Sequence, residues 1–181
     1  MHAEREITAR FLKTRSEDAF RALYRSLTPN LYRTALYLSR HDQYLAEESL
    51  QETWVIGIAK LPDFRWQSTL KTWLTGIMIN VIRDKEAKVR RHTVLRQQMP
   101  DVQEAEESQV VTAYDLKEAI NNLPKGYQEV VVLHDIEGYK HKEIADLLSI
   151  SEGTSKSQLY QARKALRNYL KDKNTNVEYY E

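Results

Sequence analysis

The chain has no cysteine, five glycines and four prolines among its 181 residues. The absence of cysteine excludes disulfides, thiol catalysis and cysteine-ligated metal sites. The scarcity of glycine and proline favours helices over sheets. No apolar run approaches the roughly 20 residues needed to cross a bilayer, and the segment from Met1 to Lys13 lacks the apolar core of a signal peptide. We therefore expect an all-α protein of the cytoplasm.

Charges are segregated along the chain, although 27 Lys and Arg nearly balance 26 Asp and Glu. Residues 83–96 hold six basic and two acidic side chains, and residues 152–173 hold the same numbers. Between them, residues 98–115 hold five acids and no Lys or Arg. The total charge argues against a polyanionic partner, but this distribution favours one.

Capping residues and apolar periodicity predict helices along most of the chain. Ser16 is placed to cap one helix, and Thr28-Pro29 has the composition of a second helix start. From Ser68 the apolar residues recur every three or four positions through Ile82. A run of three valines ending at Val132 also suits a strand, but no partner strand is evident. The predicted helices cover 16–26, 28–39, 44–59, 68 into the basic block, 112–122, 126–135, 140–148 and 152–170.

The helices group into two small domains joined by the acidic segment. We expect an N-terminal helical domain over residues 1–97 and a linker over 98–111. A C-terminal domain over 112–173 is expected to be a four-helix helix-turn-helix module, followed by a frayed tail over 174–181.

The segment from Tyr139 to Leu170 combines a short helix, a three-residue turn and a longer helix with a basic exposed face. Ser151 is placed to cap the longer helix, whose first turns would enter a DNA major groove. The basic side chains of that helix then lie where phosphate oxygens would be. The plainer alternative is an antiparallel helix pair with a solvated basic face. The full constellation favours DNA binding.

Two further segments carry candidate binding residues. Between Pro62 and Arg91, aromatic residues stand among basic ones, as a single-stranded DNA site requires, although Trp73 also fits the apolar core. Between Leu45 and Lys60, Glu48 and Glu52 lie four residues apart on one helix face. No nucleophile, metal ligand or glycine loop accompanies them. The alternatives for that helix are a solvated acidic face and a docking face anchored by Trp54.

The histidines and the absence of nucleotide motifs argue against catalysis. No two histidines stand at the spacing of helical metal ligands, so we expect no metal and no cofactor. No phosphate-binding glycine loop or serine-nucleophile motif is present. We therefore expect a protein that is not an enzyme. The five histidines are His2, His41, His92, His134 and His141.

In this order, the three segments resemble those of the extracytoplasmic-function (ECF) group of bacterial RNA polymerase sigma factors, over roughly Asp18 to Leu170. The resemblance implies a core-polymerase site, a site for the melted −10 strand and a −35 helix-turn-helix. The implied polymerase-binding residues are Glu47, Glu48, Gln51, Glu52 and Trp54. The −10 residues are taken from the aromatic segment and from the basic segment 83–96. They are Phe64, Arg65, Trp66, Lys71, Trp73, Asn80, Arg83, Asp84 and Lys88. The −35 residues are Thr154, Lys156, Ser157, Tyr160, Gln161, Arg163, Lys164 and Arg167.

The resemblance also implies partners, namely core RNA polymerase, promoter DNA and an anti-sigma factor. The chain departs from the family pattern at several positions. Trp66 and Ser149 stand where the family often has glycine, and Ser155 replaces a usual valine. Gln158 and Gln161 replace common arginines, which predicts an altered −35 preference and fewer phosphate contacts.

Two other functions compete with an alternative sigma factor. The first is a stand-alone helix-turn-helix regulator that binds duplex DNA as a dimer. The second is an enzyme or helical scaffold with an incidental basic face. The first gives no special role to the acidic helix or to the aromatic segment, and no catalytic constellation in the sequence supports the second.

Overall fold

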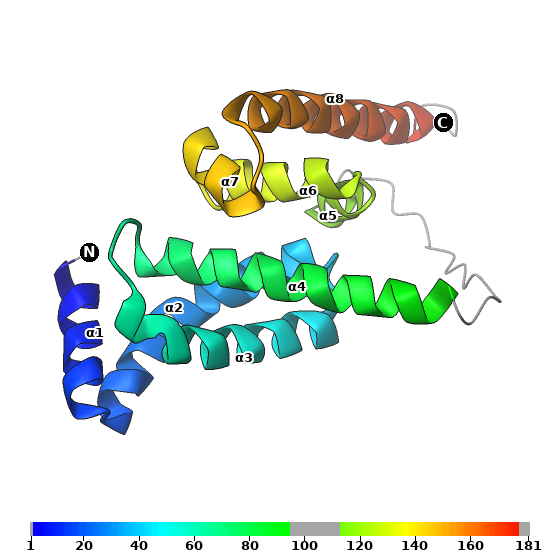
Figure 1. Cartoon of the computed structure of the whole chain (residues 1–181). Helices are drawn as coiled ribbons and strands as arrows, with labels where there is room; N and C mark the ends of the chain where they lie inside the picture. The colour runs from blue at the N-terminus through cyan, green and yellow to red at the C-terminus, as the bar shows by residue number, and fades with distance from the viewer. Residues whose placement is uncertain (1, 95–112, 178–181) are drawn as a thin grey trace. The chain divides into compact units, whose positions relative to one another are not determined.

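The computed structural model describes residues 2–94 and 113–177, with side chains from 4 to 91 and from 116 to 171. Within these ranges every regular element is helical, which confirms the all-α class (Figure 1). The chain divides into two compact units, Met1–Lys88 and Val89–Glu181. The linker predicted over 98–111 lies outside the described residues. The helices are α1 (His2–Thr14), α2 (Glu17–Leu38), α3 (Gln43–Lys60), η1 (Leu61–Asp63), α4 (Leu70–Val94), α5 (Ala113–Asn121), α6 (Lys125–Val131), η2 (Val132–Ile136), α7 (His141–Leu148) and α8 (Glu152–Val177).

Helix α1 precedes the first helix predicted from the sequence. Its buried residue Phe11 packs against Phe20 of α2, with ring centroids 5.9 Å apart. The chain reverses at Arg15, which has a φ of 51°. Ser16 then caps α2 as predicted, because its side chain accepts a hydrogen bond from the first turn of α2 at 3.4 Å.

Helix α2 is continuous where the sequence predicted two helices. The predicted start at Thr28-Pro29 is wrong, because both residues lie inside α2. The Thr28 hydroxyl accepts a hydrogen bond from Trp54 Nε1 of α3 at 3.1 Å. Leu27 and Leu31 are buried on either side of the proline. This packing outweighs the backbone hydrogen bond that proline cannot donate.

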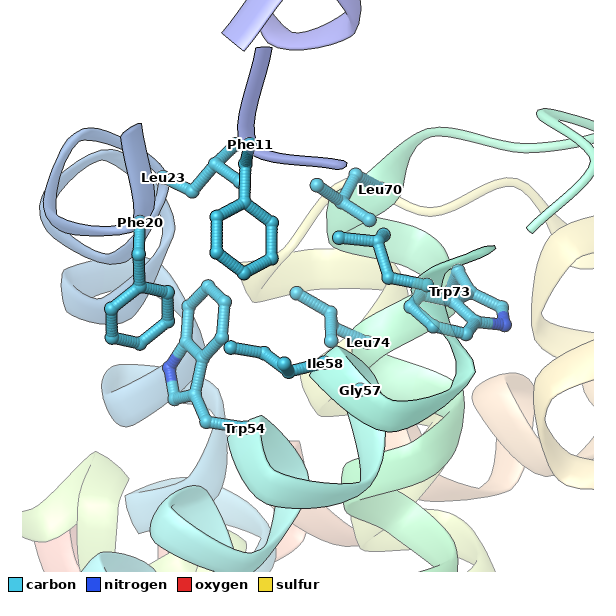
Figure 2. Close-up of a pocket in the computed structure, with 10 residues that line it drawn as sticks. Phe11, Phe20, Leu23, Trp54, Gly57, Ile58, Leu70, Trp73 and Leu74 are labelled. Carbon is cyan, nitrogen blue, oxygen red and sulfur yellow. The ribbon is translucent and has the colours of Figure 1, made fainter. Parts of the chain in front are cut away.

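Helices α3 and α4 approach each other at Gly57. A methyl group at this position would lie 2.6 Å from Leu74 Cδ2, and Leu74 is itself fully buried (Figure 2). Glycine therefore sets the distance between the two helices. The predicted apolar face of α4 is largely confirmed, because most of its members are buried, namely Leu70, Leu74, Met78, Val81 and Ile82.

The C-terminal unit contains the predicted helix-turn-helix, α7 followed by α8. The three valines ending at Val132 are buried in α6 and in the π-helical turn η2, so helix replaces the strand alternative. Ser149 ends α7 in the left-handed region with a φ of 57°. Helix α8 packs on α5, α6 and α7, and it continues to Val177, into the segment predicted as a tail.

Candidate functional site

Three glutamates of α3 and the residues beside them form a surface, here called the α3 face. It comprises Tyr44, Glu47, Glu48, Gln51, Glu52 and Val55. Glu47, Gln51 and Glu52 are exposed, and Glu48 is half-buried. Lys85 of α4 places its Nζ 3.2 Å from Glu48 Oε2 and 3.0 Å from Glu52 Oε2. The structure thus brings the two glutamates together with a cation that the sequence placed in the basic block.

Hydrogen bonds fix the charges of the α3 face. The Tyr44 hydroxyl donates to Glu48 Oε1 at 2.9 Å. The hydrogen bond from Tyr44, followed by the one from Lys85, lowers the pKa of Glu48. The hydrogen bond between Tyr44 and Glu48 also raises the pKa of Tyr44. The hydrogen bond to Glu52, followed by the one to Glu48, raises the pKa of Lys85. The glutamate and the lysine therefore remain charged at neutral pH.

Trp54 does not belong to the α3 face. It is 7% exposed, and its ring meets Phe20 at 5.9 Å and Tyr24 at 5.3 Å. Figure 2 shows it among the side chains of an apolar cavity between α1, α2, α3 and α4. Trp54 is therefore a core residue of the N-terminal unit in this structure, and its predicted role as the anchor of a docking face stays a prediction. Val55, which the sequence analysis missed, is 72% exposed. Its spacing of four residues from Gln51 was the available signal.

Three of the predicted single-strand residues, Phe64, Trp66 and Trp73, form a row, here called the aromatic row, in the loop before α4 and on its first turn. The Phe64 ring stacks on Trp73 with centroids 4.8 Å apart, and it meets Trp66 at 4.9 Å. All three rings are part-exposed, and Arg65 beside them is exposed. Trp73 therefore belongs partly to the core and partly to the surface.

The remaining candidates of this region lie along α4. Asn80, Asp84 and Lys88 are exposed and follow Trp73 at helical spacing, so they share one face with it. Arg83 is part-exposed beside this face. Lys71 is also part-exposed, but helical geometry directs it to another side of α4.

The recognition helix α8 presents its predicted residues in an ordered frame. Ser151 Oγ accepts the Thr154 N–H at 2.9 Å, which confirms the predicted cap. Ser155, Leu159 and Ala162 face the interior. Thr154 is part-exposed, whereas the other candidates are exposed, namely Lys156, Ser157, Tyr160, Gln161, Arg163, Lys164 and Arg167.

Arg163 already has a partner within the protein. Its Nε lies 2.9 Å from Asp135 Oδ2, and its Nη2 lies 2.6 Å from Asp135 Oδ1. This bidentate pair lowers the pKa of Asp135 and raises that of Arg163. Arg163 thus joins α8 to η2, and its predicted contact with a phosphate stays a prediction.

Two histidines that the sequence separates by a turn stack in the C-terminal unit. The rings of His134 and His141 lie 4.6 Å apart. His141 Nδ1 lies 2.9 Å from the hydroxyl of the fully buried Ser155. Burial, followed by the charge of His134, lowers the pKa of His141. Over the described ranges, no group of three or more His, Asp or Glu side chains is arranged to hold a metal ion.

Comparisons with known proteins agree with this geometry. The family model "Sigma-70 region 2" matches residues 23–94, and "Sigma-70, region 4" matches residues 113–166. The ECF RNA polymerase sigma factor SigM of Mycobacterium tuberculosis is 30% identical over 161 residues, which cover 88% of this chain and 81% of that protein. SigM of Bacillus subtilis is 25% identical, covering 80% of this chain and 91% of the relative.

A solved structure has the same fold. It is the sigma factor RpoE of Bartonella quintana in complex with the anti-sigma factor NepR. The TM-score is 0.70 at 27% identity, covering 84% of this chain and 96% of that one. No helix in the described part of the chain is long and apolar enough to cross a membrane.

Proposed function

The chain belongs to the ECF RNA polymerase sigma factors, and we propose which of its surfaces performs each step of transcription initiation. As an alternative sigma factor it binds core RNA polymerase and promoter DNA. The observation that carries the assignment is the presence, in one chain and in order, of an acidic helix face, an aromatic row and a capped basic helix. A stand-alone regulator would need only the last of these.

We assign polymerase docking to the α3 face. Glu47 and Gln51 are exposed on it, and Val55 adds an apolar contact next to them. The carboxylates steer the helix toward a basic partner surface, and the desolvated apolar contact supplies affinity. Lys85 neutralises Glu48 and Glu52 within the protein. We therefore assign these two glutamates mainly a structural role in the α3 face, and assign polymerase contacts mainly to its other residues.

We assign capture of the melted −10 strand to the aromatic row and the α4 face. An unstacked base gains roughly 1–3 kcal/mol on an aromatic side chain. Trp66 is part-exposed, and the neighbouring Arg65 is an exposed cation for phosphates. Strand opening follows because the open strand binds here and the duplex does not.

We assign −35 recognition to the first turns of α8. Its Ser151 cap orders the helix end that enters the major groove. Gln161 suits an adenine edge, and Lys156 and Lys164 lie toward phosphates. Arg163 is held by Asp135, so fewer phosphate contacts and a flatter salt dependence follow. The −35 and −10 sites act together through effective concentration.

We further propose that the protein works in the cytoplasm beside RNA polymerase, without catalysis of its own, and that an anti-sigma factor restrains it. RpoE of Bartonella quintana was solved with an anti-sigma factor at 27% identity to this chain. A binding assay with the candidate anti-sigma protein tests the last point, and failure to block polymerase binding would contradict it.

The assignment of surfaces is tested by separating polymerase binding from DNA recognition. We expect Glu47→Ala with Gln51→Ala to weaken co-elution with core polymerase about tenfold, because interface contacts are lost. Lys156→Ala with Lys164→Ala should preserve co-elution but reduce initiation at promoters used by the wild type. Glu17→Ala, which removes an exposed carboxylate from α2, is the matched control. Normal co-elution of the α3 variant would contradict the docking assignment.

A further inference from the structure

Trp66 adopts a backbone conformation that its residue type disfavours. Its φ is 56°, in the left-handed region where glycine is the usual residue. Such a conformation persists only where the surroundings hold it in place, and it is common at binding sites. We therefore expect the contacts of the indole ring to hold the loop in this conformation.

One contact comes from the aromatic row, and the other comes from the beginning of the chain. Phe64 meets the Trp66 ring at 4.9 Å. The guanidinium carbon of Arg5, on the first turns of α1, lies 5.0 Å from the centroid of the Trp66 ring. Figure 1 shows the start of α1 beside the loop that leads into α4. A cation is thus added to the aromatic row from a distant part of the sequence.

Helix α1 has a firm position within the N-terminal unit. Phe11, two turns after Arg5, is 6% exposed and packs on Phe20. The Arg15 guanidinium lies 5.5 Å from the Phe11 ring. Arg5 itself is exposed, so its charge is accessible to a ligand arriving at Trp66.

We propose that Arg5 is a DNA-binding residue of the single-strand site, a role that rests on the proposed capture of the −10 strand by the aromatic row. Guanidinium groups stack on aromatic faces and also donate hydrogen bonds to phosphates. An incoming base takes the place of the guanidinium on the Trp66 ring. Arg5 then pairs with a phosphate of the same strand, next to the exposed Arg65.

The test uses holoenzyme assembled from core polymerase and the full chain. The probe is a fork-junction DNA derived from a promoter that the wild-type protein uses, with the non-template strand single-stranded from the −10 element onward. We expect Arg5→Ala to weaken binding to this probe about tenfold and to reduce the salt slope by about one phosphate contact. Arg5→Lys should retain the salt slope. Arg10→Ala, which removes another exposed arginine of α1, is the matched control and should match wild type.

Each outcome of this experiment has one meaning. Equal affinity and equal salt slope for Arg5→Ala and Arg10→Ala would overturn the role of Arg5. Weaker binding of the Arg5→Ala variant with an unchanged salt slope would also overturn the DNA-binding role of Arg5. A residue that only supports the Trp66 ring changes affinity without changing the number of phosphate contacts. If wild-type holoenzyme binds the fork probe no better than a fully duplex probe, the proposed −10 capture itself fails. The two failures are therefore distinguishable.

Discussion

At the scale of single residues, the ion pair between Asp135 and Arg163 makes the stability of the C-terminal unit depend on pH. Two hydrogen bonds from Arg163, followed by one from His134, hold the pKa of this carboxyl below its usual range. The carboxyl group of an aspartate in an unfolded chain has a pKa of about 3.9. Because the folded pKa is lower, the pair stabilises the folded unit above about pH 4. This stabilisation is lost as the pH falls through the folded pKa.

Asp135→Asn is expected to remove this pH-dependent part of the stability. At pH 6 the variant should lower the free energy of unfolding of the C-terminal unit by about 1 kcal/mol, the upper range for exposed ion pairs. The difference from wild type should shrink as the pH falls below about 4. The urea midpoint of the α8 amide resonances in NMR spectra measures it. A difference that stays constant from pH 6 to pH 3 would contradict this account.

The side-chain contacts of the C-terminal unit were only partly predictable from the sequence. The cap by Ser151 follows from local sequence, and the structure confirms it. The pairing of Arg163 with Asp135 joins residues 28 positions apart, so only the folded unit reveals it. Ser155 stands where the family usually has valine, and its buried hydroxyl is paired with His141 Nδ1. A polar residue in a core costs little when its partner is present.

At the scale of elements, the turn between α7 and α8 sets the recognition helix in place. Ser149 occupies the left-handed position that ends α7, and the Ile150 N–H donates to the Ala145 carbonyl at 3.0 Å. A residue with a Cβ pays about 1 kcal/mol in this conformation relative to glycine. Ser151, two residues later, instead stabilises the start of α8 through its hydroxyl.

The two serines of this turn are expected to respond oppositely to substitution. Ser149→Gly should raise the free energy of unfolding of the C-terminal unit by about 1 kcal/mol, because the left-handed strain disappears. Ser151→Ala should lower it by a similar amount, about 1 kcal/mol, because the helix cap is lost. Urea titration followed at the α8 amide resonances measures both. A destabilised Ser149→Gly variant would show that the side chain of Ser149 has a stabilising role that outweighs its strain.

Helix boundaries were predictable where local signals act alone. Asp42, whose side chain accepts the Leu45 N–H at 2.9 Å, fixes the start of α3 within one residue of its predicted start. The predicted break at Pro29 failed because a tertiary contact overrides the proline signal: Trp54 of α3 bonds Thr28 inside α2. Helix α1 was missed because its position depends on Phe11 packing against α2.

At the scale of the whole molecule, the order of the segments carried more information than any one of them. An acidic helix or a basic helix alone is usually a solvated surface. The acidic α3, the aromatic row at the start of α4 and the basic α8 occur in that order, and family models match both units. The sequence did not indicate that Lys85 would fold onto the acidic face or that Arg5 would reach Trp66. Both contacts depend on how helices pack within the N-terminal unit.

Transcription by purified core RNA polymerase, with and without this protein, on DNA fragments from the genome of the source bacterium tests the central claim most directly. We expect discrete new start sites that require the protein and share one −35 and one −10 sequence at constant spacing. The chain with both Lys156→Ala and Lys164→Ala serves as the control and should lose most of these starts. If no new start sites form and no stable complex with the matched core polymerase is found, the sigma-factor account is contradicted.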